Sequence, residues 1–389
     1  MADTSDLLVV GGGVMGLWGA LKAAESGLSV TLIDVGEIGC GASGGVLGAL
    51  FPWMPDRWDA KKQYQLHALV SLPAEIARLE GLTGLSGNFR RVGRIIPLPK
   101  PHLRDIALRH QRDAEANWRA DEQHFHWHVR EGVPVNTSVD PEAFAGGHVF
   151  DTLAGRIEPR ALIRLLRAAL EQQPKVRIVE HAPLVSLDPK AGRAEVAAHG
   201  QITFSRAFIT AGVASFAILE TLLPPLPKPL GQGVKGQAAL LRADLDPASP
   251  VVFLDGVYIV AHEGGHAAIG STSENGYDDP RSTDAQLDNV IERARALIPA
   301  LRDAEVIERW AGIRPKAIGR DPLVGPIPGH PNVIALTGGF KISFGVAHRL
   351  ALSALGFALG QNLAPLPGGF TVQGQLAREL GWPIEADGS

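Results

Sequence analysis

The sequence contains a single cysteine, Cys40, among its 389 residues. One cysteine excludes an internal disulfide framework and any cysteine-rich metal cluster, and it suits a reducing compartment. No base-bearing motif adjoins Cys40, so we interpret it as a small loop residue rather than a reactive thiol or a covalent attachment point. A cytoplasmic protein is therefore expected.

Long apolar runs are also missing. No stretch reaches the roughly 18 uninterrupted apolar residues of a spanning helix, because even 346–360 contains His348 and Arg349. The first six residues carry acidic rather than basic charge, and glycines immediately interrupt the apolar run 7–10, which is unlike a signal peptide. These features predict a soluble chain without a membrane span.

A strong excess of either charge is absent as well. The 37 lysines and arginines are balanced by 41 aspartates and glutamates, a formal charge of -4, so nothing global favours nucleic acid or an anionic membrane as a partner. The 45 glycines and 28 prolines lie between apolar segments, which indicates many tight turns rather than disorder. At roughly 100 to 200 residues per domain, the length predicts two or three globular units.

What the sequence does contain is a dinucleotide-binding pattern near its start. The strand-length apolar run 7–10 ends at the glycine motif 11–16 (Gly-Gly-Gly-Val-Met-Gly), and the helical segment 17–26 follows. The first glycine permits a sharp turn, the third lets the backbone approach a pyrophosphate, and the last lets the helix pack closely on the strand. The phosphates are expected at the helix N-terminus.

An acidic residue completes this pattern. The apolar run 28–33 predicts a second strand, and Asp34 stands at its end, where a carboxylate accepts hydrogen bonds from ribose hydroxyls. The same carboxylate would repel a 2′-phosphate, which disfavours NADP. The motif alone leaves NAD and FAD open.

Two short motifs match catalytic patterns in the wrong context. Residues 41–45 fit G-x-S-x-G, but they do not lie between a strand and a helix, so we expect a small-residue loop packed against a flat ligand. Residues 262–266 fit H-E-x-x-H, but two adjacent glycines oppose the helix that a zinc site requires. We expect a hairpin turn between strands 257–261 and 267–269 instead.

His124, His126 and His128 alternate at strand period and would share one face of a strand. No carboxylate that would complete a metal shell is identifiable from the sequence. We therefore interpret these histidines as a surface of a substrate domain, and we expect no metal site.

The remaining pattern indicates a discontinuous nucleotide domain interleaved with a sheet-based unit. Segment 51–149 looks inserted, because it is rich in tryptophan and in long charged helical stretches. The small residues 210–212 end an apolar strand, as required where the backbone passes close to a cofactor. Expected helices are 60–79, 102–120, 159–173 and 283–298, and expected strands are 176–179, 184–187, 193–198 and 207–209.

Four separated segments together resemble the D-amino-acid oxidase (DAO) family of FAD-dependent oxidoreductases, with glycine oxidase and sarcosine oxidase most similar. They are the motif 11–16 with Asp34, the loop 41–48, Val-Lys-Gly-Gln at 234–237 and Trp-Ala-Gly-Ile-Arg-Pro at 310–315. The resemblance extends from position 7 to about 360. It implies FAD rather than NAD.

The resemblance implies a mixed α/β fold, in which a Rossmann-like FAD-binding domain is interleaved with an antiparallel-sheet substrate domain. The predicted FAD-binding segments are 1–50, 150–228 and 305–370. The substrate segments are 51–149 and 229–304, and 371–389 form a C-terminal tail.

The resemblance also implies which residues hold FAD. The glycine motif would bind the pyrophosphate, Asp34 and Val35 the ribose, the backbone of Leu184 the adenine, and the loops 42–46 and 338–345 the flavin. A helix N-terminus at the flavin would stabilise the negative charge of its reduced form. The implied cofactor residues are Gly11, Gly13, Val14, Met15, Gly16, Asp34, Val35, Ala42, Ser43, Gly44, Gly45, Val46, Leu184, Gly212, Gly339, Phe340, Lys341, Ile342, Ser343, Phe344 and Gly345.

Three residues match substrate-site positions of the family. Arg314 matches the arginine that grips the substrate carboxylate, for which a guanidinium fork is suited. Lys341 falls where glycine oxidase has an arginine and sarcosine oxidase a lysine, and it would bind carboxylate or favour oxygen reduction. Tyr258 matches a tyrosine that lines the site. A structural ion pair for Arg314 and simple packing for Tyr258 are the alternatives.

Two departures from glycine oxidase concern the pocket. Gly256 stands where that enzyme has a histidine, and Val46 where it has a methionine near the flavin. Both changes predict a larger or less polar pocket, and hence a substrate larger than glycine.

The implied activity is oxidation of the C–N bond of a small amino acid or a carboxylated secondary amine. Hydride would pass to flavin N5, the imine would hydrolyse, and O2 or another acceptor such as a quinone would reoxidise the flavin. Phe-Pro-Trp-Met-Pro at 51–55 also resembles the flavin domain of a tRNA wobble-uridine modifying enzyme, although the charge of -4 does not support an RNA partner. A non-catalytic flavin-binding module is a further alternative, and the chain is a candidate homo-oligomer.

Overall fold

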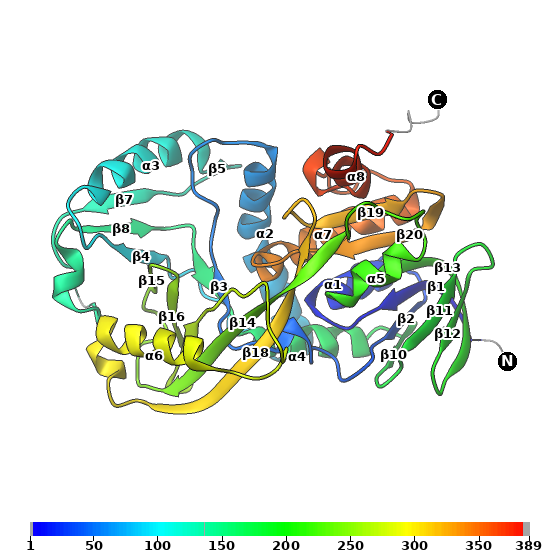
Figure 1. Ribbon diagram of the computed structural model, residues 1–389, viewed down its shortest axis with the longest axis horizontal. Coiled ribbons are helices and arrows are strands. Elements are labelled where there is room, and N and C mark those ends of the chain that lie inside the picture. Colours follow the sequence, from blue (N-terminus) through cyan, green and yellow to red (C-terminus); the bar gives the residue numbers. More distant parts are fainter. Residues whose placement is uncertain (1–2, 136, 384–389) are drawn as a thin grey trace.

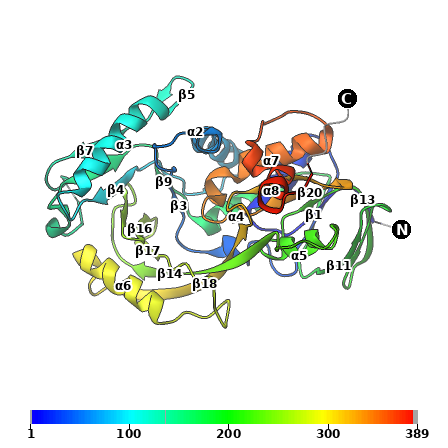
Figure 2. The ribbon, with the colours of Figure 1, turned by 45° about the horizontal axis from the view of Figure 1, so that its top comes forward.

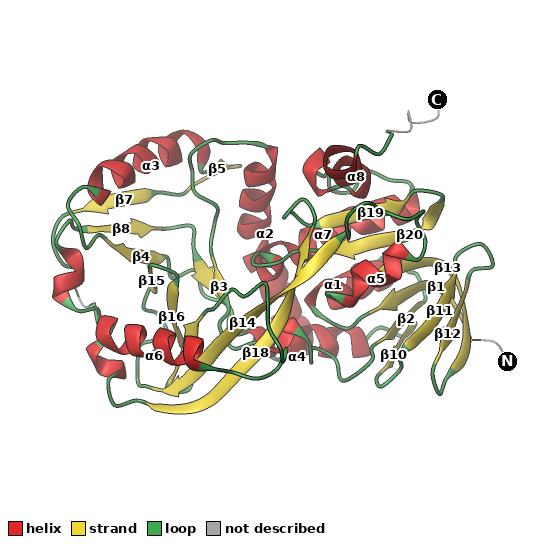
Figure 3. Cartoon of the chain, viewed as in Figure 1, coloured by secondary structure: helices red, strands yellow, loops and turns green. Residues whose placement is uncertain are grey.

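The computed structural model describes residues 3–135 and 137–383. Two eight-stranded sheets lie side by side along the long axis of the molecule (Figures 1 and 3). The chain passes between them repeatedly, so neither sheet is built from one continuous segment.

The first sheet contains the N-terminal strand and is parallel at its centre. Its order is β10-β2-β1-β13-β12-β11, and β20 pairs with both β13 and β19. The strands β10, β2, β1, β13 and β20 run parallel, while β11, β12 and β19 join by antiparallel pairing. Their bounds are β1 (Asp3–Val10), β2 (Val30–Ile33), β10 (Val176–Val179), β11 (Leu184–Asp188), β12 (Arg193–Val196), β13 (Gly200–Ile209), β19 (Leu323–Ile327) and β20 (His330–Thr337).

Helices cover both faces of this sheet. Leu7 and Val9 of β1 belong to one apolar core, and Leu8 and Val10 belong to another on the opposite face. Burial on both faces explains why β1 reads as a continuous apolar run rather than an alternating one. The first core contains α1 (Val14–Glu25), α2 (Ala60–Thr83), α4 (Pro159–Glu171) and α7 (Ser343–Leu359), and the second contains α5 (Ala214–Glu220) and α8 (Val372–Leu380).

The second sheet has the order β18-β14-β17-β16-β15-β4-β8-β7 and is antiparallel except where β15 pairs with β4. Helix α6 (Ala285–Leu297) packs on one face, and α3 (Leu103–Asn117) lies beside the edge strand β7 (Figure 2). The strand bounds are β4 (Arg94–Pro97), β7 (Trp127–Arg130), β8 (His148–Asp151), β14 (Gly231–Arg242), β15 (Val251–Leu254), β16 (Val257–His262), β17 (His266–Gly270) and β18 (Glu305–Ala317).

The remaining elements are short. Strand β3 (Ala49–Leu50) pairs with β9 (Gly155–Arg156), and β5 (Arg119–Ala120) pairs with β6 (Gln123–His124). The single-turn 3-10 helices are η1 (Ala42–Gly44), η2 (Pro141–Phe144), η3 (Pro299–Leu301) and η4 (Gly368–Phe370). In the described part of the chain, no helix combines the length and apolar character needed to cross a bilayer.

The mixed α/β fold class predicted from the sequence is confirmed, and several predicted elements end early. The helix predicted over 102–120 stops at Asn117, because Trp118 is buried and the chain reverses through Asp121, whose φ is +52°. The strand predicted over 193–198 ends at Val196, before the positive φ of Ala198. The three histidines do not share one strand, since β6 ends at His124 and β7 begins at Trp127.

The predicted FAD-binding segment 305–370 divides between the sheets. Its first part forms β18 of the second sheet, and the rest contributes β19, β20 and α7 to the first. The domain boundaries stay a prediction. Within the predicted tail 371–389, residues 372–380 form α8, and residues 384–389 lie outside the described part of the chain.

Candidate functional site

A cavity of about 1020 Å³ is lined by residues of both sheets. Its volume lies at the upper end of the range of ligand sites, roughly 300–1,000 Å³. Segments far apart in the sequence form its walls, namely 10–15, 33–35, 40–54, 182–184, 210–214, 310–315 and 337–345. The site therefore depends on the tertiary fold rather than on any one segment.

One end of the cavity is built on the glycine motif. Gly11 has a φ of +110°, and a Cβ added there would lie 2.6 Å from the Thr210 carbonyl oxygen. A Cβ on Gly16 would lie 1.9 Å from the Gly11 oxygen. Only glycine fits either position, so the predicted turn and the close packing of α1 are both observed.

Asp34 lies at the same end, directly after β2. Its Oδ2 accepts a hydrogen bond from the Gly12 N–H at 2.6 Å, and its Oδ1 accepts one from the Gly36 N–H at 2.8 Å. These bonds fix the carboxylate at the wall of the cavity, which Leu184 of β11 also lines. The arrangement suits recognition of ribose hydroxyls.

Two helices begin at the cavity. Helix α1 starts after Gly13 and α7 after Ile342, and neither of these residues caps its helix with a side chain. Helix N-termini carry partial positive charge and unpaired N–H groups. The cavity thus offers two places that favour negative charge, one at each helix.

The other end of the cavity contains the predicted substrate residues. The loop 338–345 approaches β18 through a bridge between Lys316 and Gly339, and the Phe340 N–H donates to the Pro315 oxygen at 3.2 Å. This pairing brings Lys341 towards Arg314. Desolvation, followed by the charge of Arg314, lowers the pKa of Lys341.

Arg314 is a desolvated cation at this end. Its Nη1 donates to the Thr272 oxygen at 3.1 Å, and burial lowers the pKa of its guanidinium. In the described part of the chain no carboxylate forms an ion pair with it, which argues against the purely structural alternative. A desolvated guanidinium that feels the charge of Glu274 but has no carboxylate in ion-pair contact is suited to an anionic ligand.

Gly236 makes room for this guanidinium. A Cβ on Gly236 would lie 2.0 Å from Arg314 Nη1 and 2.1 Å from Cζ, so the side chain of Arg314 lies across the glycine on the neighbouring strand. This contact explains the glycine of the Val-Lys-Gly-Gln segment.

Replacing Gly236 with alanine should displace the Arg314 guanidinium while leaving the fold intact, because the clash is with the end of a flexible side chain. We expect KM for a carboxylated substrate to rise by about 10- to 100-fold, since a displacement of about 1 Å has effects of that size. Steady-state kinetics would measure it. Gly276→Ala is the matched control, because a methyl there meets nothing within 4 Å; equal KM values for the two variants would contradict the assignment.

Tyr258 belongs to an aromatic wall. Its ring stacks on Phe51, with centroids 5.2 Å apart and planes at 29°, and lies 4.7 Å from the ring of Phe253. Phe51 in turn covers the Arg94 guanidinium at 4.4 Å. Burial raises the pKa of Tyr258, so the phenol stays protonated at neutral pH.

The structure places nearly all predicted site residues at one cavity. Every member of the predicted set lines it except Gly16, which packs α1 on β1, and Gly44, whose oxygen accepts from Arg160 Nε at 2.8 Å. Gly256 is also outside the lining and forms the turn between β15 and β16 with a φ of +84°. That Gly256 enlarges the pocket stays a prediction, whereas Val46 lines the cavity.

Sequence reasoning missed several lining side chains. Trp310 enters the sequence-based prediction only as part of a motif, yet it lines the cavity. Its ring lies so close to Gly45 and Gly312 that a Cβ atom added to these glycines would be 3.2 and 2.5 Å from the ring, respectively. Phe51 and Arg94 also line the cavity. The two glycines that contact the Trp310 ring are 267 positions apart in the sequence. No local sequence pattern therefore predicts that both lie against the same ring.

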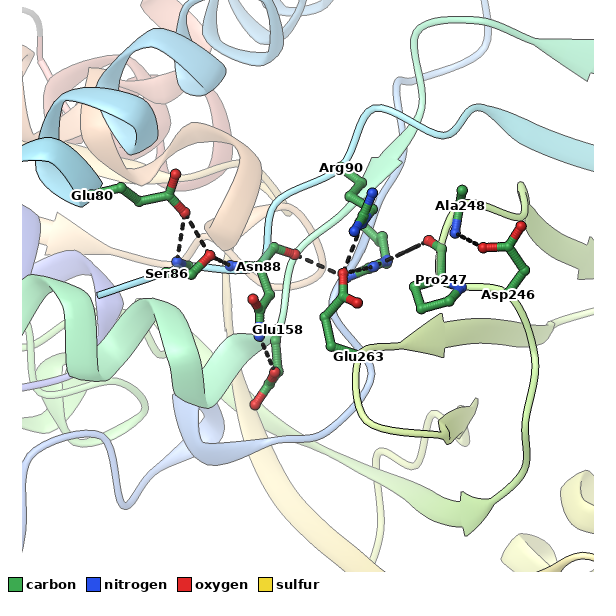
Figure 4. A network of polar contacts seen from close by, with 11 residues as sticks. Glu80, Ser86, Asn88, Arg90, Glu158, Asp246, Pro247, Ala248 and Glu263 are labelled. Carbon is green, nitrogen blue, oxygen red and sulfur yellow. Dashed lines mark hydrogen bonds and ion pairs between the residues drawn. The ribbon is translucent and has the colours of Figure 1, made fainter. Parts of the chain in front are cut away.

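The H-E-x-x-H motif forms the predicted hairpin. His262 pairs with His266 across β16 and β17, and His262 Nε2 lies 3.1 Å from the oxygens of both Val46 and Leu47, so it supports the cavity loop. Glu263 makes ion pairs with Arg90 at 2.7 Å and Arg156 at 2.9 Å (Figure 4). These partners account for the motif without zinc.

The G-x-S-x-G motif is a loop, as predicted. Its centre forms η1 rather than a strand-to-helix turn, and Ser43 Oγ accepts a hydrogen bond from the Val14 N–H at 3.0 Å. Cys40 lines the cavity nearby, and burial and the charge of Asp34 raise the pKa of its thiol. A raised pKa disfavours the reactive thiolate.

A family model described as "FAD dependent oxidoreductase" matches residues 6–352 of the sequence. The chain belongs to this DAO family. The resemblance drawn from the separated motifs is thereby confirmed, and FAD is the cofactor.

Curated relatives of this FAD-dependent oxidoreductase include glycine oxidases. It is 30% identical to glycine oxidase from Pseudomonas aeruginosa over 348 residues, which cover 86% of this chain and 89% of the relative. It is 29% identical to glycine oxidase from Pseudomonas putida over 338 residues, covering 84% and 87%. The crystal structure of glycine oxidase from Geobacillus kaustophilus matches with a TM-score of 0.84 and 22% identity, covering 95% of this chain and 99% of the other.

The cavity of this oxidoreductase fits an extended FAD. Asp34 at one end is suited to the adenosine ribose, the α1 N-terminus with the close backbone of the glycine motif to the pyrophosphate, and the α7 N-terminus to a flavin that becomes negatively charged on reduction. Bound there, FAD supplies a two-electron acceptor.

Proposed function

We propose that this oxidoreductase oxidises the C–N bond of a small amino acid or of a secondary amine that carries a carboxylate. The observation that carries the proposal is the desolvated guanidinium of Arg314, which lines the cavity from β18 of the second sheet and has Lys341 and Tyr258 nearby. Two cations at one end of a largely apolar cavity favour a carboxylate ligand. The glycine oxidases among the relatives support an amino acid as the substrate.

The composition of the cavity supports catalysis by positioning. Among the described residues that line it, the one carboxylate is Asp34 at the nucleotide end, and histidine is absent. No carboxylate or histidine at the substrate end is therefore available to act as a general base. Arg314 and Lys341 would fix the carboxylate, and hence the direction of the Cα–H bond.

The proposed reaction balances as a two-electron oxidation. Bound FAD would supply the acceptor for the hydride of the Cα–H bond, the neutral amine would lose a proton from nitrogen, and water would hydrolyse the resulting imine to an oxo acid and ammonia or an amine. Two electrons and two protons then pass to O2, giving H2O2, or to another acceptor such as a quinone. The apolar wall of Phe51, Phe253 and Tyr258 would exclude water while the hydride moves.

The decisive experiment is an anaerobic screen of amino acids and N-alkyl amino acids against the FAD-loaded protein, with flavin absorbance as the signal. We expect bleaching by at least one carboxylated amine and none by the matching amine without a carboxylate. Bleaching by the amine that lacks a carboxylate, and not by the carboxylated amine, would contradict the proposed role of Arg314. Bleaching only by a tRNA-borne carboxymethylaminomethyl group would replace the proposal with the tRNA-modifying alternative.

A further inference from the structure

Glu115, His124 and His126 form a cluster of metal-ligand atoms at the outer edge of the second sheet. The Glu115 Oε2 lies 3.4 Å from His124 Nε2, and the Glu115 Oε1 lies 3.0 Å from His126 Nδ1. The potential donor atoms of all three residues are within 4.8 Å of one another. The carboxylate that the sequence alone did not identify thus comes from the last turns of α3.

The backbone holds this cluster in place. After α3 the chain turns back through the β5–β6 hairpin, in which Arg119 pairs with His124. The Phe125 N–H donates to the Trp118 oxygen at 2.9 Å, and the His126 N–H donates to Thr152 Oγ1 at 2.8 Å. Hydrogen bonds therefore hold the backbone of residues 124–126, and both histidine side chains project from this segment.

We propose that Glu115, His124 and His126 bind a divalent transition metal ion of the zinc type. Ligands that share a tetrahedral zinc at about 2.0–2.1 Å are roughly 3.3 Å apart, and the two contacts of Glu115 are close to that spacing. Two imidazoles and one carboxylate suit Zn²⁺, Ni²⁺ or Cu²⁺, whereas Mg²⁺ prefers oxygen ligands alone.

The state of His124 Nε2 provides a second observation. This atom is buried and makes no hydrogen bond within the described residues, although it faces the Glu115 carboxylate. Buried polar atoms without a partner are uncommon and call for an explanation. A metal ion bound between the two side chains would give His124 Nε2 a partner.

The surroundings leave room for a further ligand. The side chains of His124, His126 and Glu115 are 25%, 34% and 50% exposed, so water can reach a fourth position. The His128 ring stacks on that of His126, with centroids 5.1 Å apart. The ion would join α3 to the segment preceding β7, which is the edge strand of the sheet.

Zinc titration of the full-length, FAD-loaded protein tests this proposal. The protein should carry no polyhistidine tag, should be freed of metal with a chelator, and should be studied by calorimetry. We expect one Zn²⁺ per chain, a higher melting temperature with zinc, and competition by Ni²⁺ but not by Mg²⁺. Glu115→Gln should weaken zinc binding by at least about 10- to 100-fold, and His124→Gln combined with His126→Gln should abolish it.

The control removes two other exposed histidines, His102 and His199, by substitution with glutamine. That double variant should bind zinc as the parent does. Absence of saturable binding to the parent would overturn the proposal, and so would equal affinity of the Glu115→Gln variant and the control. Flavin content, measured in every sample, shows that a loss of zinc binding does not reflect unfolding.

Discussion

Replacing Arg314 with alanine should lower kcat/KM for a carboxylated amine by about 10²- to 10⁴-fold. A guanidinium fork can donate two hydrogen bonds to a carboxylate, and each hydrogen bond to a charged group contributes about 1.5–3 kcal/mol. The rate loss would come mainly from KM if Arg314 binds substrate and transition state equally, and from kcat as well if it aligns the Cα–H bond. Steady-state kinetics and anaerobic flavin reduction measure the two contributions.

The Arg314→Ala variant should still bind FAD, because Arg314 belongs to β18 of the second sheet, whereas the glycine motif and Asp34 belong to the first. Arg314→Lys is the conservative control, which keeps the charge but loses the fork and should recover only part of the activity. An unchanged kcat/KM in Arg314→Ala would assign this residue a structural role. It would leave the flavin assignment intact, because that rests on the family and on the glycine motif with Asp34.

Replacing Asp151 with alanine should lower the free energy of unfolding more than the other substitutions proposed for this protein. Asp151 Oδ2 accepts from Arg94 Nε at 2.6 Å, and the two side chains are 0% and 2% exposed. Asp151→Ala would leave the Arg94 charge buried without a partner, which costs about 3–5 kcal/mol. The free energy of unfolding, measured by denaturant titration at one fixed FAD concentration, would show the loss.

An exposed ion pair provides the comparison. Arg242 and Glu305 lie 3.1 Å apart, but their side chains are 67% and 68% exposed. Glu305→Ala should therefore change the free energy of unfolding by less than about 1 kcal/mol. Replacing both buried partners, as Arg94→Met with Asp151→Leu, should restore much of the stability lost in Asp151→Ala; a double variant as unstable as the single one would contradict this explanation.

Some parts of the site are predictable from residue patterns alone, without the resemblance to a family. These are the parts that form within one short segment of the sequence. The glycine motif and Asp34 follow from a strand, a turn, a helix and a second strand within about thirty positions, and the structure contains each of them. The hairpin at 262–266 was predictable for the same reason, because adjacent glycines oppose a helix locally. In these cases the local conformational preferences agree with the tertiary fold.

Contacts between distant segments were not predictable from pattern. Arg314 and Lys341 were assigned to one site only through resemblance, since nothing in their spacing indicates the bridge between Lys316 and Gly339. The buried pair of Arg94 and Asp151 depends on the register of β4 and β8. The early end of α3 depends on burial of Trp118, which overrides the helical preference of the residues after it.

The central place of β1 has a consequence for synthesis of the chain. β1 pairs with β2, which starts at residue 30, but its other neighbour, β13, is reached only at residues 200–209. At about 5–20 residues per second, β1 waits roughly 10–40 s on the ribosome with one edge unpaired. Because both its faces are apolar, this interval is when the nascent chain most needs protection from aggregation.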